Sequence, residues 1–427
     1  MLKFQAPKTK SQTNPNNSNS KFQTKEFIGY KEALELTLSH VAAGASETLP
    51  LERLVGRVLA EDVVARVDCP SVSTSRKDGF AVVAADLSQA AEQNPVRLKV
   101  LGNLTAGDRR QLAIHRGQTV RVTTGAPLPA GADAVLSEEF CRRHSDVIEA
   151  FNTAEAGRNI QQQGRDIRIA DALVARGVKL KPAQIGLLAA AGLAAAAVYT
   201  CPKVAVIATG DEVVAPGRQL RRGQLYASNL VQIGAWLTQF GLPYITELVA
   251  DQKEDIKRTI EKHLPEVDAF ITSGGAWGSE RDLILDVVAE LNWQGIYHRV
   301  RMGPGKPAGF GLLDGKPFFC LPGGPSSNEM AFLQLGLPAL LKMRGEPPVA
   351  FPTIAASLTQ AVTGQKQWTD FIHARLEKRQ GRLFVRPARL KSALQSMAQK
   401  QALIIIPEDR AEFAAGETID IQLISCT

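Results

Sequence analysis

The arrangement of apolar runs between residues 203 and 346 constrains the fold more than any other feature of this chain. Four short runs rich in Val, Ala, Ile and Phe alternate there with segments whose apolar residues recur at helical spacing. The predicted strands lie within 203–212, 244–249, 267–275 and 318–324, and the predicted helices are 228–240, 253–263, 282–291 and 327–342. Strands that alternate with helices of this length predict a parallel, doubly wound α/β sheet.

Ligands of such a sheet bind beyond the carboxyl ends of its strands. Three of the predicted strands end in short turns, at residues 209–212, 272–275 and 322–325. Because the carboxyl ends of parallel strands lie at one edge, we expect these turns to form a single binding site.

The first turn carries two adjacent carboxylates, Asp211 and Glu212. Neighbouring carboxylates repel each other, so a bound cation or a proton-transfer role would account for them. An ordinary capped turn accounts for them equally well, because Asp and Gly are common turn residues.

The second turn, Ser273-Gly274-Gly275, presents backbone N–H groups with little side-chain obstruction, which suits phosphate or another oxyanion. A Gly-Gly pair alone is typical of a tight turn, but its place at the same edge favours an anion site. Asp282 begins the following predicted helix, either as its N-cap or as a third carboxylate near the anion.

A basic, glycine-rich loop at 299–307 contains Arg301 and Lys306. Its three cations and its Gly and Pro residues favour an anion site over a rigid exposed turn. The run 321–325 is followed by a helix, which adds a helix N-terminus at the same edge.

The remaining patterns divide the chain further. Residues 1–26 form a basic leader that is too polar to fold. Residues 27–62 and 168–202 form a discontinuous helical domain, in which a helix at 30–43 packs against a helix at 181–197. We expect a β-rich inserted domain at 63–167 and a C-terminal β-barrel at 347–427 around the α/β domain at 203–346.

Charge and composition exclude several classes of protein. The formal net charge is +7, but five leader lysines supply most of it, whereas a nucleic-acid binder carries its basic surface on the fold. No apolar run reaches the roughly 18 residues of a membrane helix, and the leader lacks the apolar core of a secretory signal, which predicts a cytoplasmic protein. The five scattered cysteines exclude a disulfide framework or a soft-metal site, so any metal should be a hard cation such as Mg²⁺.

Taken in order, the motifs of this chain resemble those of the molybdopterin molybdenumtransferase family, which is related to the gephyrin E-domain. The series covers nearly the whole chain from about residue 28, and its collinearity makes it more specific than any single motif. The matching segments are 68–70, 77–81, 124–129, 159–160, 164–167, 209–212, 223–226, 273–275 with Asp282, 304–307 and 321–323.

The resemblance implies an enzyme of molybdenum cofactor synthesis with this same domain order, including a molybdopterin-binding α/β domain. Such enzymes take adenylylated molybdopterin and molybdate, hydrolyse the adenylate with Mg²⁺ and release AMP. The resemblance also implies a homodimer whose site lies between the α/β domain of one subunit and the β-rich domain of the other. Implied protein partners are the molybdopterin adenylyltransferase and molybdoenzyme apoproteins, with no nucleic acid and no membrane.

The same resemblance assigns roles to individual residues. Asp211 and Glu212 would serve in metal binding or proton transfer, Asp282 would be a further metal ligand, and Asp166 a supporting acid. The residues that would bind the pterin and its terminal phosphate are Ser273, Gly274, Gly275, Lys306 and Arg301. Those that would face the partner's cleft across the dimer are Thr124, Asp78 and Ser75.

Several positions depart from the family pattern. The changed positions are Ser73 to Lys77, Arg165, Ala227, Gly303, Gly324, and Leu390 with Lys391. Acids are lost and cations are gained, which must change the affinities for Mg²⁺ and anions. A non-catalytic or altered-specificity molybdopterin-binding or carrier protein is therefore the alternative to a working transferase. A nucleotide pyrophosphatase of the competence-damage type is a more distant one, which the inserted β-rich domain and the C-terminal barrel disfavour.

Overall fold

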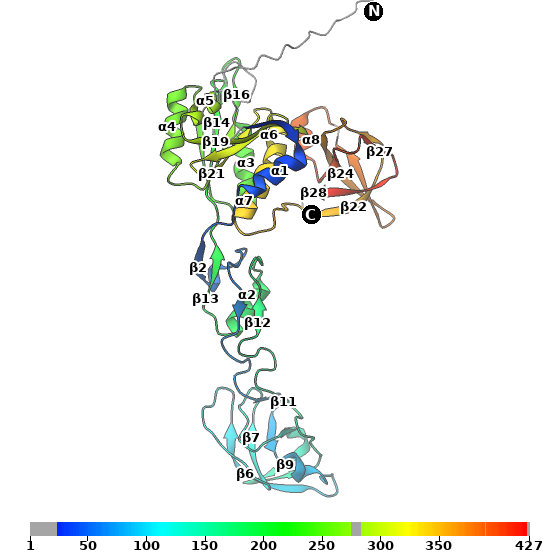
Figure 1. Cartoon of the computed structure of the whole chain (residues 1–427). Helices are drawn as coiled ribbons and strands as arrows, with labels where there is room; N and C mark the ends of the chain where they lie inside the picture. Colours follow the sequence, from blue (N-terminus) through cyan, green and yellow to red (C-terminus); the bar gives the residue numbers. More distant parts are fainter. Residues whose placement is uncertain (1–23, 275–282, 389, 425–427) are drawn as a thin grey trace, which may run out of the picture. The chain divides into compact units, whose positions relative to one another are not determined.

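The computed structural model describes residues 24–274, 283–388 and 390–424 of the chain (Figure 1). They form two compact units. One unit is Ser46–Val198, and the other combines the residues before 46 with those from Tyr199 onward.

The second of these units contains the predicted α/β sheet. Four neighbouring strands are parallel and follow the order β17 (Tyr244–Val249), β14 (Val204–Thr209), β18 (Ala269–Ser273) and β21 (Lys316–Leu321). The sheet then continues with an antiparallel hairpin that the sequence analysis missed, β20 (Gly309–Leu313) and β19 (Trp293–Gly303). The sheet is therefore mixed rather than wholly parallel.

Helices cover both faces of this sheet, and the residues of β14 alternate between the two cores. Val204 and Val206 pack in one core, with Leu237 of α3, whereas Ala205 and Ile207 pack in the other. Burial on both faces explains the continuous apolar character of the strand. The helices of the domain are α3 (Ser228–Gln239), α4 (Lys253–His263), α5 (Leu283–Ala289), α6 (Pro325–Ala331) and α7 (Leu337–Met343).

The first helix, α1 (Tyr30–Ser39), packs in the α/β unit. Its residue Ala33 is completely buried in the core that contains α3 and α7, and the preceding strand β1 (Lys25–Gly29) pairs in parallel with β19. The expectation that this helix packs against the helix at 181–197 is therefore wrong.

The predicted helix at 181–197 is also shorter than expected. Helix α2 (Pro182–Ala190) ends before Gly192, whose φ of +82° favours glycine. The alanine-rich residues that follow form β13 (Ala195–Tyr199), which pairs with β2 (Ser46–Pro50). Strand pairing therefore overrides the helix propensity of alanine here.

The C-terminal region forms a closed barrel, because β24 pairs with both β25 and β26. Its remaining neighbours complete the ring in the order β25, β22, β28, β26. Strand β19 pairs with β24 at Met302 and Thr369, which joins the barrel to the α/β sheet. The barrel elements are β22 (Thr353–Leu358), β24 (Thr369–Arg379), β25 (Arg382–Pro387), β26 (Ala402–Ile406) and β28 (Thr418–Leu423), with a short helix α8 (Ala393–Ala398).

The unit Ser46–Val198 holds the predicted β-rich region. Its sheet has six strands in the order β8 (Ala134–Ser137), β5 (Gly79–Val82), β7 (Gln118–Val122), β6 (Val96–Leu104), β10 (Val147–Ala150) and β9 (Cys141–His144). Two short strand pairs join segments that precede this sheet in the chain to segments that follow it. They are β4 (Thr74–Ser75) with β11 (Ile160–Gln161) and β3 (Val63–Val64) with β12 (Ala172–Val174).

A separate small core in this unit joins residues 49–65 to residues 167–198. This core is discontinuous in the sequence. Helix α2 is its one α-helix in the described chain, and strand pairs supply the rest. No described helix of either unit combines the length and apolarity needed to cross a membrane.

Candidate functional site

A cavity of about 510 Å³ lies at the carboxyl ends of β14 and β18, where the sequence predicts a site. Its polar lining includes Thr209, Glu212, Asn229 and Ser273. Its apolar lining comes from Val213, Leu225, Tyr226 and Leu394. A cavity of this size with one apolar wall and a few convergent polar groups suits a small heterocyclic ligand.

Two short strands form the apolar side of the cavity. Strand β15 (Val213–Val214) pairs in parallel with β16 (Leu225–Tyr226), directly after the Asp211-Glu212 turn. Leu225 is half exposed, at 51%, although it is a large apolar side chain. Tyr226 and Leu394 are exposed as well, so the cavity has an apolar wall that is open to solvent.

Ser273 occupies the end of β18 and lies on the floor of the cavity. Its Oγ accepts hydrogen bonds from Asn229 Nδ2, at 3.1 Å, and from Asn328 Nδ2, at 3.0 Å. The two asparagines belong to the first turns of α3 and α6, so three elements fix this hydroxyl.

Gly274 follows with φ +105°, and a Cβ atom there would lie 2.5 Å from the Thr209 carbonyl oxygen. Only glycine therefore fits this close approach of two strand ends. The Gly274 N–H donates a long hydrogen bond, 3.4 Å, to the Leu321 carbonyl. This N–H therefore has a hydrogen-bond acceptor within the protein, whereas the motif predicts an N–H that is accessible to an anion.

The two predicted carboxylates of the first turn, Asp211 and Glu212, are exposed. Asp211 Oδ1 accepts a hydrogen bond of 3.1 Å from the backbone N–H of Asp251. Asp251 follows β17 and is a third acid at this edge that the sequence analysis missed. Burial, with the charges of Asp211 and Glu212, raises the pKa of the Asp251 carboxyl.

A magnesium ion is the metal that the family resemblance implies. Among residues 24–274, 283–388 and 390–424, no three His, Cys, Asp or Glu side chains gather closely enough to form a complete metal site. Mg²⁺ is commonly held by one or two carboxylates together with substrate phosphates, and the exposed pair Asp211 and Glu212 fits that donor set. The predicted residues Gly275 and Asp282 lie outside the described residues.

Lys306 and Arg301 do not line the Ser273 cavity. Lys306 Nζ lies 5.4 Å and 5.7 Å from the ring centroids of Phe27 and Trp368. Arg301 Nη1 donates to the Phe27 carbonyl at 2.7 Å, and its Nε donates to the Gln367 carbonyl at 3.1 Å. Both cationic side chains therefore contact β1 and also the loop that precedes β24.

The cavity continues beyond the Ser273 floor. A smaller space of about 410 Å³ shares Pro325 and Leu394 with it, and a third of about 700 Å³ shares Ser326 and Ala393 with the smaller one. Together they form a cleft that passes the start of α6 and α8 and reaches the barrel. We call this surface the α6–α8 cleft.

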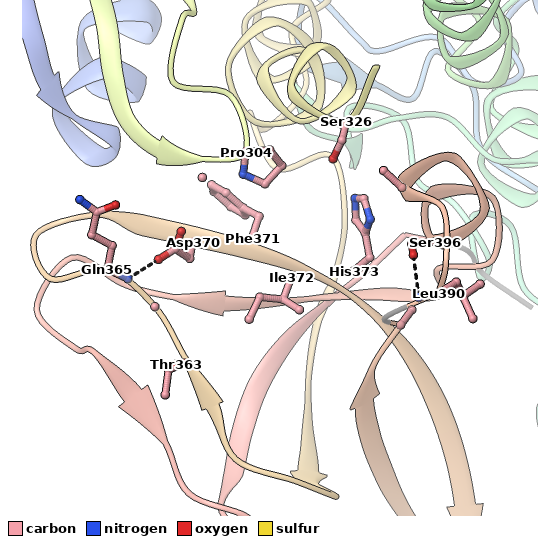
Figure 2. A pocket seen from close by; sticks show the side chains of 14 residues that line it. Pro304, Ser326, Thr363, Gln365, Asp370, Phe371, Ile372, His373, Leu390 and Ser396 are labelled. Carbon is pink, nitrogen blue, oxygen red and sulfur yellow. Dashed lines mark hydrogen bonds between the residues drawn. The ribbon is translucent and has the colours of Figure 1, made fainter. Parts of the chain in front are cut away.

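Figure 2 shows the barrel end of the α6–α8 cleft, with His373 of β24 and Ser326 of α6 on its walls. His373 Nε2 is buried and forms no hydrogen bond with the described residues. Burial, with the nearby Lys400, lowers the pKa of His373, so its imidazole is neutral at pH 7.

The predicted residues Ser75, Asp78, Thr124 and Asp166 lie in the unit Ser46–Val198. Asp78 Oδ1 accepts hydrogen bonds from Thr124 N, at 2.7 Å, and from Thr124 Oγ1, at 2.9 Å, and these bonds lower the pKa of the Asp78 carboxyl. Ser75 lies in β4, which pairs with β11, and Gln161 of β11 donates to Asp166 at 2.7 Å. The structure thus brings these polar residues to adjoining segments of one unit.

Three family models match consecutive parts of the chain. They describe the MoeA N-terminal region (domain I and II) at residues 28–192, a probable molybdopterin binding domain at 205–342 and the MoeA C-terminal region (domain IV) at 355–424. A molybdopterin molybdenumtransferase 2 from Mycobacterium tuberculosis is 32% identical over 380 residues, which are 88% of this chain and 94% of that protein. The chain belongs to the molybdopterin molybdenumtransferase family.

Further comparisons agree with this assignment. A molybdopterin molybdenumtransferase from Staphylococcus aureus is 30% identical over 405 residues, covering 93% of this chain and 95% of that protein. The crystal structure of a molybdopterin biosynthesis MoeA protein from Pyrococcus horikoshii superimposes with a TM-score of 0.83 at 33% identity and covers 94% of this chain and 100% of that one. The multi-domain fold and the C-terminal barrel are thus those of a molybdopterin molybdenumtransferase.

The positions that depart from the molybdopterin molybdenumtransferase pattern have distinct surroundings. Ala227 is buried and lines the Ser273 cavity, so no carboxylate occupies that wall. A Cβ atom at Gly303 would lie 2.4 Å from Asp370 Oδ1, so a side chain at 303 requires Asp370 to move. Gly324 has open space around it and Arg165 is exposed, so nothing in the structure explains those two changes.

Proposed function

We propose that this chain inserts molybdate into adenylylated molybdopterin in the cytoplasm, with release of AMP. Its family membership supports a transferase of molybdenum cofactor biosynthesis. The observation that supports the specific reaction is the Ser273 cavity, which combines an apolar wall for a flat heterocycle, a polar floor and the carboxylate of Glu212, with the exposed Asp211 next to it in the sequence.

We assign different parts of the substrate to different residues of this cavity and of the adjoining turn. Leu225, Tyr226 and Leu394 exclude water from the heterocycle, and the Ser273 hydroxyl donates to a phosphate oxygen. Asp211 and Glu212 would hold a Mg²⁺ ion together with the substrate phosphates. When bound, the ion supplies positive charge to the phosphoanhydride as it is cleaved.

The direct test is AMP release from adenylylated molybdopterin by the purified protein, with and without molybdate and Mg²⁺. We expect AMP release that requires Mg²⁺ and increases with molybdate. Asp211→Asn should abolish turnover with little effect on folding, whereas Asp420→Asn, an exposed acid of the barrel, should leave the rate unchanged. An unaltered rate in Asp211→Asn would remove the assigned role of Asp211.

A binding or carrier protein is the second candidate function. The buried Ala227 in the cavity wall favours it, because a metal site there has fewer carboxylates to use. Tight binding of the pterin without AMP release under every condition would select this candidate and exclude the transferase.

We further propose that the working form is a homodimer in which Ser75, Asp78, Thr124 and Asp166 of one subunit complete the site of the other. This proposal is supported by the hydrogen bonds that Thr124 donates to Asp78, and by the pairing of β4, which contains Ser75, with β11, whose Gln161 donates to Asp166. An equal mixture of Asp211→Asn and Asp78→Asn subunits should recover about a quarter of the wild-type activity, because half of the dimers then contain one intact site. No recovery after subunit exchange would contradict a shared site.

A further inference from the structure

The Ser273 hydroxyl receives two hydrogen bonds from side-chain amides. Asn229 Nδ2 lies 3.1 Å and Asn328 Nδ2 lies 3.0 Å from its Oγ. Ser273 is only 4% exposed and Asn328 only 1%, so water does not compete freely for these bonds. The amides approach from α3 and α6, which are separate elements of the same unit.

Backbone carbonyls fix the orientation of both amides. Asn229 Nδ2 also donates to the Gly323 carbonyl at 2.8 Å, and Asn328 Nδ2 also donates to the Pro322 carbonyl at 2.8 Å. A carbonyl oxygen can only accept, so turning either amide over would place two acceptors against each other. Each Nδ2 group, and not the Oδ1 atom, must therefore face Ser273.

This arrangement decides what the hydroxyl can do. A serine hydroxyl has two acceptor lone pairs and one proton to donate. The two amides occupy both lone pairs, so the proton of Ser273 must point away from them. Ser273 lines the cavity, and within the described chain its Oγ donates no hydrogen bond.

The orientation of the Asn229 side-chain amide leaves one of its buried polar atoms without a hydrogen bond. Its Oδ1 atom is buried and accepts no hydrogen bond from the described residues. An unpaired buried acceptor is unfavourable, by about 1–3 kcal/mol in general. The protein tolerates that cost where the amide donates to Ser273, which is expected of a group retained for binding rather than for stability.

We propose that Asn229 and Asn328 are positioning residues that hold the Ser273 hydroxyl as a pure hydrogen-bond donor toward an anionic oxygen of the ligand. The proposal rests on the proposed function, in which that oxygen belongs to the phosphate of the pterin. A phosphate oxygen only accepts, so it matches a hydroxyl that can only donate. A ligand that presents an N–H or O–H donor at this point finds no lone pair on Ser273 and is disfavoured.

The test compares two stable probes, neopterin monophosphate and neopterin, which differ only in the phosphate. Their affinities are measured by pterin fluorescence, and the readout is the ratio of the two. We expect the wild-type protein to prefer the phosphorylated probe. Asn229→Asp should lower that preference by about tenfold to a hundredfold, because the carboxylate accepts the Ser273 proton and a hydrogen bond to a charged group is lost.

Neutral variants separate this effect from added charge. Asn229→Ala and Asn328→Ala should each lower the preference less than Asn229→Asp, because one lone pair is freed and the hydroxyl can rotate. Ser273→Ala should abolish the contribution of the hydroxyl, and Ser273→Thr, which keeps a hydroxyl, should retain it. Asn292→Asp, on an exposed turn outside the cavity lining, controls for the added charge. Asn229 is only partly buried, so its variants remain informative if Asn328→Ala does not fold.

The outcomes separate this proposal from the proposed function. A purely structural role for the asparagines would lower the affinity for both probes equally and leave their ratio unchanged, which overturns the proposal. A wild-type protein without preference for the phosphorylated probe also overturns it, whether or not AMP is released. A preference that falls in Asn229→Asp and, by less, in the neutral Asn229→Ala, but not in Asn292→Asp, upholds the positioning role even where AMP release fails and the transferase reaction is abandoned.

Discussion

Lys400 Nζ lies 2.8 Å from both carboxylate oxygens of Glu329, and the two side chains are only 4% and 1% exposed. Glu329 Oε1 also accepts hydrogen bonds from Gln232 Nε2, at 2.7 Å, and from Trp236 Nε1, at 3.1 Å. Lys400 follows α8, Glu329 lies in α6, and the other two residues lie in α3. One buried carboxylate thus joins the helices on both sides of the α6–α8 cleft.

Removing the cation of this pair should destabilise the protein. In Lys400→Met the Glu329 charge stays buried without its partner, which should lower the free energy of unfolding by about 3 kcal/mol. Urea denaturation measures the change. Lys25→Met serves as the control, because its pair with Glu32 is 53% and 46% exposed and should contribute less than about 1 kcal/mol. Equal stability of the two variants would contradict a structural role for the buried pair.

The contact of Lys306 with Trp368 should be measurable as a coupling energy. A double-mutant cycle of Lys306→Met and Trp368→Leu should give about 0.5–1 kcal/mol, as expected for a cation over an aromatic ring. The same Lys306→Met variant tests the anion role that the motif predicts. A fall in affinity for neopterin monophosphate without any coupling to Trp368 would favour phosphate binding over this contact.

Substitution of Gly274 should be far more damaging than substitution of Gly323 beside it. Gly274→Ala places a Cβ atom 2.5 Å from the Thr209 carbonyl oxygen at a φ of +105°. We therefore expect the free energy of unfolding to fall by about 2 kcal/mol or more. Gly323→Ala is the matched control, because its Cβ would meet nothing closer than Gly274 Cα at 3.8 Å. Thermal unfolding compares the two. A similar melting temperature for both variants would show that the strand ends separate easily.

Acid should destabilise the α/β unit through His298, which is only 6% exposed. Burial, with the adjacent Arg299, lowers the pKa of His298 to about 3, whereas an unfolded histidine titrates near 6.5. In the unfolded chain His298 therefore binds a proton below about pH 6.5, whereas in the folded chain it binds one only below about pH 3. The stabilising contribution is complete above pH 6.5 and is lost as the pH falls.

His298→Gln removes this linkage and tests it. Between pH 6.5 and pH 4 the wild-type free energy of unfolding should fall more steeply than that of the variant, by about 3 kcal/mol at pH 4. Urea denaturation at a series of pH values gives the two curves. Parallel curves would mean that His298 titrates alike in the folded and unfolded states.

The sequence predicted most of the α/β domain correctly. The predicted segments 244–249 and 253–263 coincide with β17 and α4, because an amphipathic helix and its neighbouring strand carry strong local periodicity. The hairpin of β19 and β20 was missed, since Arg299 and Arg301 interrupt the apolar pattern of β19. Helix α8 was missed because only Ser396 and Met397 of its six residues are buried.

In the candidate site, too, some residues were predicted from the sequence and others were missed. Ser273, Gly274 and Glu212 were predicted from turns at strand ends, and the structure places all three in one cavity. Asn229 and Asn328 were not predicted to bind, because an asparagine in the first turn of a helix is typical of a cap. They lie 44 and 55 residues from Ser273 in the sequence, and no local pattern reports such a contact.

The sequence by itself determined the alternating strands and helices, the edge of the sheet at which the strand-end turns meet and the family to which the motifs point, because each depends on local periodicity or on short turns. Only the tertiary structure decided that α1 packs with α7 rather than with α2, that Lys306 faces aromatic rings, and that Ser273 is held as a donor. Those outcomes depend on contacts between distant segments. A hydrogen-bond direction in particular is set by every partner of a group at once, and those partners meet only in the folded chain.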